Sequence, residues 1–147
     1  MKNNRILLVE DNPDHQELTL MTLAENNVRN EIVVANDGIE ALDYLFGTGK
    51  HAGRDPRDAP ALILLDLKLP KVGGIEVLRR VRDDERTRYV PVVILTSSSE
   101  EEDIVASLES GANSYVRKPV DFTRFVEQVK RLHVYWLLVH ETPGNSV

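Results

Sequence analysis

Short apolar runs alternate along the chain with segments of helical periodicity. Five of these runs have the length of a β-strand and lie at residues 6–9, 31–35, 61–65, 92–95 and 114–116. The third run contains no polar residue, which is typical of a strand covered on both faces. The repeated alternation of strand and helix predicts an α/β protein with a parallel sheet of five strands and with five helices.

Each predicted strand is followed by a predicted helix. Asn12 and Pro13 are typical of a helix start, because asparagine caps a first turn and proline fits its first position, and we expect this helix to reach about Glu25. Residues 47–60, which hold three glycines and two prolines, predict a long solvated loop. We expect the last helix to extend to about Val139. The later helices are indicated by apolar residues at helical spacing, which are Ile39, Leu42 and Phe46, then Ile75, Leu78 and Val81, then Ile104 and Leu108, and finally Phe122, Phe125, Val126, Val129, Leu132, Trp136 and Leu137.

Length and composition indicate one soluble domain. A chain of 147 residues with 41% hydrophobic and 29% charged residues fits one globular domain, which we expect at residues 1–140, followed by a polar tail at residues 141–147. The net charge of −6 disfavours binding to nucleic acid or an anionic membrane. No cysteine is present, which excludes disulfides and thiolate metal sites. The first apolar run is too short for a signal peptide or a membrane span, so we expect a cytoplasmic protein.

Polar side chains stand where the predicted strands end. Glu10 and Asp11 follow the first strand, and Asp66 follows the third. Thr96 follows the fourth strand and Lys118 the fifth. In an open parallel sheet, ligands bind beyond the carboxyl ends of the strands, in the crevice where the strand order reverses. For the flavodoxin-like, doubly wound order 2-1-3-4-5 this crevice lies between the first and third strands, so we expect the three acids to converge there.

Three converging carboxylates need a cation or a proton. Each pair repels by about 4 kcal/mol at a separation of about 4 Å when the effective dielectric constant is about 20. Mg²⁺ is the expected cation, because it prefers one or two carboxylates together with waters and phosphate oxygens. Lys118 and the Thr96 hydroxyl would then bind the remaining phosphoryl oxygens, and Asp66 would act as nucleophile and form an aspartyl phosphate. Asp66 considered alone is equally well explained as a turn residue.

These motifs together resemble the receiver domains of two-component response regulators. The resemblance extends over roughly residues 5–132 and implies that Asp66 accepts a phosphoryl group from a histidine kinase. It further implies that Asp11 is a direct Mg²⁺ ligand and that Glu10 is a ligand acting through water. The motifs that carry the resemblance are Val9-Glu10-Asp11-Asn12, residues 64–70 with Gly73-Gly74, Leu95-Thr96, Gly111-Ala112, and Tyr115-Val116-Arg117-Lys118-Pro119.

The resemblance also implies how the domain switches. The backbone carbonyl of Lys68 would be a further metal ligand. Thr96 and Tyr115 match the family's switch pair, whose hydroxyl and ring move inward on phosphorylation, and Lys118-Pro119 matches its lysine and usually cis proline. The face formed by the fourth helix, the fifth strand and the fifth helix would then change shape. Because the length leaves no room for an output domain, we expect the protein to act through partners.

Two segments indicate a narrower group and a dimer. Residues 47–60 and the sequence Val134-Tyr135-Trp136-Leu137 are similar to the stand-alone response regulators of bacterial phytochrome histidine kinases. That similarity implies a phytochrome kinase as partner and a homodimer formed through the face of the fourth helix, fifth strand and fifth helix. The last two turns of the predicted final helix are apolar nearly all round, which indicates a contact surface. The alternative is that this extension folds back onto its own domain.

Other functions fit the sequence less well. A phosphatase of the haloacid dehalogenase type also uses a strand-end aspartate and Mg²⁺, but it needs a second acid two residues later, where this chain has Lys68. Residues 47–50 resemble part of a phosphate-binding loop, yet His51 stands where serine or threonine is required. A transcriptional regulator would need a DNA-binding unit that the length excludes. Four histidines lack metal-ligand spacing, which favours solvated or packing roles, and they are His15, His51, His133 and His140.

Two features near the predicted site bear on its regulation. Lys68 and Ser98 occupy positions that, in the family this chain resembles, tune the access of water to the phosphoryl group. The acidic run at residues 100–103 is most simply the first turn of a helix, where negative charge is stabilised by the helix dipole.

Overall fold

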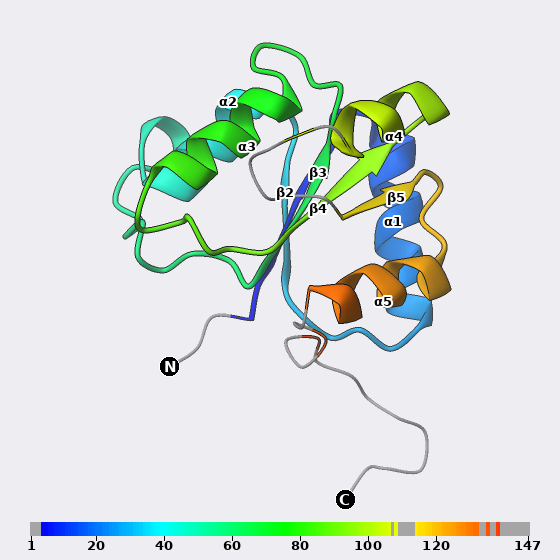
Figure 1. The fold of residues 1–147 in the computed structure, drawn as a ribbon. Helices are drawn as coiled ribbons and strands as arrows, with labels where there is room; N and C mark the ends of the chain where they lie inside the picture. Colours follow the sequence, from blue (N-terminus) through cyan, green and yellow to red (C-terminus); the bar gives the residue numbers. More distant parts are fainter. Residues whose placement is uncertain (1–3, 107, 109–113, 133–134, 136–137, 139–147) are drawn as a thin grey trace, which may run out of the picture.

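A five-stranded parallel sheet organises the domain (Figure 1). The computed structural model describes residues 4–106, 108, 114–132, 135 and 138. The strand order is β2-β1-β3-β4-β5, which confirms the predicted flavodoxin-like topology. The strands are β1 (Ile6–Val9), β2 (Ile32–Ala35), β3 (Leu62–Asp66), β4 (Val92–Thr96) and β5 (Tyr115–Arg117).

Helices cover both faces of the sheet, so each strand is buried on two sides. Alternate residues of β1 point to opposite faces, with Leu7 and Val9 in one apolar layer and Ile6 and Leu8 in the other. Helices α2, α3 and α4 complete the first layer, and α1 and α5 complete the second (Figure 1). The helices are α1 (Pro13–Glu25), α2 (Gly38–Phe46), α3 (Gly74–Asp83), α4 (Ser99–Ala106) and α5 (Phe122–Arg131), with a short 3₁₀ turn η1 (Gly49–His51) after α2.

Strand register brings the predicted site residues to one edge. Val9 pairs with Leu65, and Asp66 pairs with Leu95, so β1, β3 and β4 end level with one another. The chain leaves β1 toward the face covered by α1 and leaves β3 toward the face covered by α3. The crevice between these two departures is where the topology places a ligand site.

Side-chain caps start the helices that flank this edge. The Oδ1 atom of Asn12 accepts hydrogen bonds from the backbone N–H of Asp14 at 2.8 Å and of His15 at 3.2 Å, which confirms the predicted start of α1. Asp37 caps α2 in the same way, because its carboxylate accepts from the backbone N–H of Glu40 at 2.8 Å. Each cap satisfies donors that have no partner within the helix.

The segment 47–60 is more ordered than the predicted solvated loop. Gly47 ends α2 in the left-handed conformation, with φ of 66°. The guanidinium group of Arg54 lies 3.9 Å from the ring centroid of Tyr44 and donates hydrogen bonds to the backbone carbonyls of Tyr44 and Asp58. Arg54 therefore attaches the loop to α2 by stacking and hydrogen bonding. The glycine and proline content of the loop did not indicate this attachment.

Two details of the helices differ from the prediction. In α4, Val105 is buried and Ile104 is 43% exposed, so the inward face lies one residue later than expected. Helix α5 ends at Arg131, whereas the apolar pattern predicted an end near Val139. Much of the predicted extension lies outside the described residues, but Leu138 is described and packs into the apolar layer beneath α5. Leu138 thus fits the alternative in which the chain folds back onto its own domain. Among the described residues, no helix is long and apolar enough to cross a membrane.

Candidate functional site

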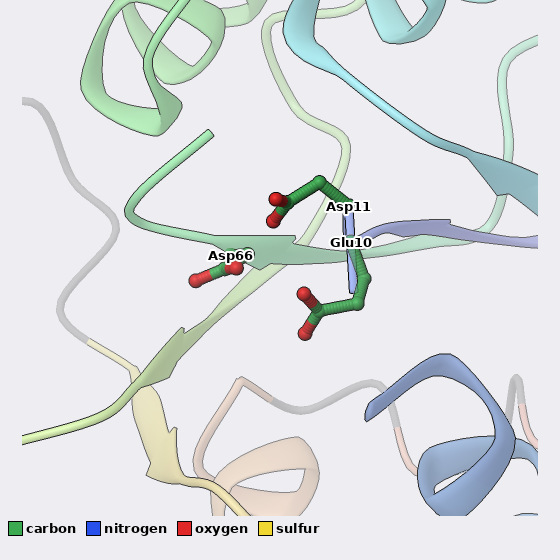
Figure 2. A group of neighbouring side chains, drawn as sticks. All are labelled: Glu10, Asp11 and Asp66. Atoms are coloured by element: carbon green, nitrogen blue, oxygen red, sulfur yellow. The ribbon is translucent and has the colours of Figure 1, made fainter. Parts of the chain in front are cut away.

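Three carboxylates converge at the edge where β1 and β3 end (Figure 2). Glu10, Asp11 and Asp66 each place an oxygen within 4.8 Å of the others. Glu10 and Asp66 are buried, whereas Asp11 is exposed to solvent. The convergence predicted from the strand ends is therefore confirmed.

The side chain of Lys118 places an ammonium group beside these carboxylates. Its Nζ atom lies 2.9 Å from Glu10 Oε1 and 3.2 Å from Asp66 Oδ2, and its side chain is only 9% exposed. The backbone N–H of Lys118 donates to the carbonyl of Thr96 at 2.7 Å, which ties the end of β5 to the end of β4. The peptide bond between Lys118 and Pro119 is cis, as the resemblance implied.

His15 is a third partner of Lys118 that sequence reasoning missed. Its Nδ1 atom lies 3.1 Å from Lys118 Nζ and 3.8 Å from Glu10 Oε1. An ammonium group has three donors: Glu10 and Asp66 accept from two, and His15 accepts from the third when its Nδ1 atom carries no proton. One feature of the sequence could have indicated this contact: His15 lies in the first turn of the helix that begins directly after Glu10 and Asp11.

The carboxylates and Lys118 perturb one another's protonation. Burial and the nearby charge of Glu10 raise the pKa of Asp66 to about 7, although the ammonium of Lys118 acts in the opposite direction. Burial lowers the pKa of Lys118, but its hydrogen bonds and charge attraction to Glu10 and Asp66 outweigh this effect and leave the pKa above its usual value. Three carboxylates facing one ammonium form an electron-rich oxygen donor set. Such a set fits a hard divalent cation.

Thr96 contributes a buried hydroxyl at the same edge. It is fully buried, and its Oγ1 atom has no hydrogen-bond partner among the described residues. An unpaired buried polar atom costs about 1–3 kcal/mol, so such atoms are uncommon in folded proteins. Because Leu95 pairs with Asp66, Thr96 lies one residue beyond that pair. The hydroxyl is therefore available to a ligand that enters beside Asp66.

Tyr115 lies on the neighbouring strand at a lower level than Thr96. It pairs with Ile94, while Thr96 pairs with Arg117. Its half-buried ring packs against the apolar layer beneath α4. The assignment of Thr96 and Tyr115 as a switch pair stays a prediction.

The loop after β3 is held by close backbone contacts. A Cβ atom on Gly74 would lie 2.3 Å from the carbonyl oxygen of Asp66, and one on Gly38 would lie 2.0 Å from the carbonyl oxygen of Val72. Lys71 adds an ion pair to Asp37, with 3.3 Å between Nζ and Oδ2. Only glycine allows these approaches, so Gly74 lets α3 begin directly against the backbone of Asp66, and Gly38 lets α2 begin directly against Val72.

Lys68 connects Asp66 to helix α4. Its backbone N–H donates to Asp66 Oδ1 at 3.3 Å, and its Nζ atom lies 3.3 Å from Glu101 Oε2. The role of its carbonyl as a metal ligand stays a prediction. Glu101 was not distinguished in the sequence from the other acids of its helical turn, yet it is only 3% exposed.

Two cavities adjoin the cluster. A cavity of about 240 Å³ opens beside the Lys118 side chain and is lined by His15, Leu18, Thr19, Ser97, Lys118 and Pro119. A wider groove of about 620 Å³ runs along the outer side of β5 and α5, and charged residues of both signs line it. The first cavity lies between α1 and the Lys118 side chain, while the second lies on the face predicted to change shape.

Comparison with known sequences identifies a family for most of the chain. The family model described as response regulator receiver domain matches residues 6–130. The probable methanogenesis regulatory protein FilR2 of Methanothrix harundinacea is 40% identical over 141 residues, which cover 96% of this chain and 88% of that protein. The response regulator Rcp1 of Synechocystis sp. is 36% identical over 132 residues, which cover 90% and 88%.

Solved structures show the same similarity in three dimensions. The bacteriophytochrome response regulator AtBRR is 53% identical, with a TM-score of 0.86 over 93% of this chain and 97% of that chain. The Mn²⁺-bound form of Rcp1 is 33% identical, with a TM-score of 0.70 over 94% and 99%. The phosphorylated cyanobacterial phytochrome response regulator RcpA is 38% identical, with a TM-score of 0.70 over 90% and 93%.

Proposed function

This chain belongs to the response regulator receiver domain family, whose members are phosphorylated on an aspartate by a histidine kinase, and we propose that Asp66 is the phosphoacceptor here. The observation that carries this assignment is the position of Asp66, buried at the switch point of the sheet between two further carboxylates and the ammonium of Lys118. The protein is accordingly a signalling switch, and the chemistry that we assign to it is its own phosphorylation and dephosphorylation.

Phosphorylation requires Asp66 in its ionised form. A carboxylate oxygen of Asp66 attacks the phosphorus of a phosphohistidine, the new O–P bond forms as the P–N bond breaks, and the imidazole leaves. Lys118 stays beside the reacting carboxylate, where its ammonium bonds a phosphoryl oxygen. The unpaired Thr96 hydroxyl donates to another phosphoryl oxygen.

Glu10, Asp11, Asp66 and the carbonyl of Lys68 are the residues we assign to Mg²⁺. When bound, the ion neutralises charge between the carboxylates and the phosphoryl oxygens. The oxygen-only donor set supports this choice, and the Mn²⁺-bound structure of the relative Rcp1 supports a divalent ion. Asp11 is the ligand most open to solvent, so it is suited to exchange of the ion.

A labelling experiment tests the assignment. The purified chain is incubated with Mg²⁺ and either a phosphorylated histidine kinase or a small acyl phosphate, and the acid-stable, base-labile phosphate on the protein is counted. Asp66→Asn should lose all incorporation, while Asp14→Asn, an exposed acid of the same neighbourhood, should retain it. Incorporation in Asp66→Asn equal to that of the unaltered chain would refute the assignment.

The phosphodonor is a histidine kinase, and we infer one of the phytochrome class. The support is that AtBRR and RcpA, which this chain resembles in sequence and fold, are a bacteriophytochrome and a phytochrome response regulator. The cavity beside Lys118 suits the approach of the donor histidine, because Leu18, 49% exposed on α1, gives an apolar contact at its rim. Transfer measured from each histidine kinase of the same cell would identify the partner. A chain that accepts phosphate only from kinases without a phytochrome would contradict the class.

We also infer that the chain forms a homodimer through α4, β5 and α5. The groove on this face is lined by positively and negatively charged side chains. Such a surface can pair with the same surface of a second copy across a two-fold axis. Sedimentation with and without a phosphoryl analogue tests this inference, and a monomer at every concentration would contradict it. The charged lining residues of the groove are Glu102, Arg117, Lys118, Asp121, Arg124, Glu127 and Arg131.

A further inference from the structure

Glu101 is a buried carboxylate within an otherwise solvated acidic turn. It is 3% exposed, whereas its neighbours Glu100 and Asp103 are exposed. Four residues later, Val105 is also buried, so both side chains lie on the inward face of α4. A carboxylate is costly to bury unless donors surround it, so the bonds that Glu101 makes explain its position.

Two donors hold this carboxylate, and they come from the two loops that flank Asp66. The backbone N–H of Ser97 donates to Glu101 Oε1 at 2.8 Å, and Lys68 Nζ lies 3.3 Å from Glu101 Oε2. Ser97 follows Thr96 directly, and Lys68 donates its own backbone N–H to Asp66. Glu101 therefore bridges the end of β4 to the loop after β3, beside the phosphoacceptor.

The bond to Ser97 differs from an ordinary helix cap. The hydroxyl of Ser98 accepts from the backbone N–H of Glu101 at 3.3 Å, which is one half of a capping box. In the usual box the glutamate would return a bond to the N–H of the serine itself. Here the carboxylate reaches one residue further back, to Ser97, and so toward the site. Capping the helix does not require that extra reach.

We propose that Glu101 is a positioning residue that sets the affinity of the site for the phosphoryl group by competing with it for the Ser97 N–H. This inference rests on the proposed phosphorylation of Asp66. A phosphoryl group brings nearly two negative charges and three strong acceptor oxygens to the edge where Ser97 lies. Glu101 occupies that donor in the unphosphorylated chain, and Lys68 holds Glu101 in place. Phosphorylation therefore releases Glu101 from Ser97 and transfers the Ser97 N–H, and with it the loop after β4, to the phosphoryl group.

Beryllofluoride, which forms a phosphoryl-like adduct with an aspartate, is the probe that tests this competition. Its dissociation constant is measured by calorimetry at saturating Mg²⁺ for the unaltered chain, Glu101→Gln and Glu100→Gln. Glu100→Gln removes the same charge from the same turn at an exposed position, so it controls for general electrostatics. We expect Glu101→Gln to bind about tenfold tighter than Glu100→Gln, because a neutral amide oxygen competes for the Ser97 N–H less strongly than a carboxylate does. A Glu101→Gln affinity equal to the control would overturn the proposal.

Lys68→Ala gives a second test that does not disturb the buried side chain. The Lys68 side chain is 81% exposed, so the variant should fold, and its backbone N–H to Asp66 is kept. Loss of a nearby cation should by itself weaken binding of an anionic probe. The competition predicts the opposite: Lys68→Ala should bind beryllofluoride more tightly than the unaltered chain. When position 101 is already Gln, adding Lys68→Ala should give no further tightening, because the effects of two coupled residues are not additive. Weaker binding in both backgrounds would contradict the role given to Lys68.

The backbone amide of Ser97 reports the same event directly. Its proton resonance should move on adding beryllofluoride to the unaltered chain as its acceptor changes from a carboxylate to the adduct. In Glu101→Gln the free chain should already show a shifted resonance. Failure of the unaltered chain to bind beryllofluoride at all would count against Asp66 as phosphoacceptor, whereas binding with no difference between variants counts only against Glu101.

Discussion

The ammonium nitrogen of Lys118 lies 3.2 Å from Asp66 Oδ2, although the two residues are 52 positions apart in the chain. The ion pair forms because β3 and β5 end at the same edge of the sheet on either side of β4. It offsets only part of the charge in the cluster, since burial and Glu10 still raise the pKa of Asp66 to about 7. Repulsion between the carboxylates therefore destabilises the site when no ligand is bound, and this destabilisation should change with pH and with Mg²⁺.

The charge at Asp66 should destabilise the fold at alkaline pH. Its pKa is about 7 in the folded chain and about 3.9 in an unfolded chain, so between these values the folded state binds more protons. Stability should fall as pH rises from about 4 to about 7 and stay lower above that. In buffer with chelator, Asp66→Asn should be more stable at pH 8 by roughly 1–2 kcal/mol, less than the full pKa shift because solvent screens the pocket. Urea unfolding at pH 4 should show no difference, and a constant difference at both pH values would argue against this cause.

Mg²⁺ should remove the same destabilisation. An ion that binds only the folded state stabilises it by about 2.7 kcal/mol at a free concentration 100 times its dissociation constant. The rise in melting temperature on adding Mg²⁺ at pH 8 should be large for the unaltered chain and small for Asp11→Asn. Asp14→Asn removes a nearby exposed carboxylate and should keep the full rise. An equal rise in Asp11→Asn would exclude Asp11 as a ligand.

Gly74 should be essential where its neighbour Gly73 is not. Alanine at position 74 would bring its Cβ atom to 2.3 Å from the carbonyl oxygen of Asp66, while alanine at position 73 meets no atom within 4 Å. We expect Gly74→Ala to cost about 1–3 kcal/mol of stability and to lower the rate of phosphate incorporation, because relief of the clash displaces Asp66. Chemical denaturation and labelling of both variants check this, and similar losses in Gly73→Ala would contradict it.

The acidic cluster could be predicted because it depends on local order along the chain. Glu10 and Asp11 follow β1 directly, Asp66 ends β3, and parallel strands align their ends. His15 and Glu101 could not be predicted in the same way. His15 meets Lys118 across 103 positions, and Glu101 differs from the acids beside it only in being buried. Both roles follow from how the helices approach the edge of the sheet, which periodicity alone does not specify.

Tyr135 and Leu138, the residues described after Leu132, allow a similar comparison of an exposed and a buried position. An apolar pattern continues past Arg131, and it indicates burial without saying against what. Leu138 is 7% exposed and belongs to the layer beneath α5, whereas Tyr135 is 39% exposed. Leu138→Ala should therefore lower the free energy of unfolding by about 2–4 kcal/mol. Tyr135→Ala should change it by much less. Urea denaturation of both variants checks this, and an equally small change in Leu138→Ala would contradict the packing of Leu138 beneath α5.

The shared register of β1, β3 and β4 also ties signalling to correct folding. One residue of slip along a strand is about 3.3 Å and turns the side chain to the other face. A slip of β3 by one position would therefore take Asp66 away from Glu10 and Lys118 and place it in an apolar layer. A misregistered chain could not accept phosphate. A kinase therefore phosphorylates only those copies whose strands have paired in the native register.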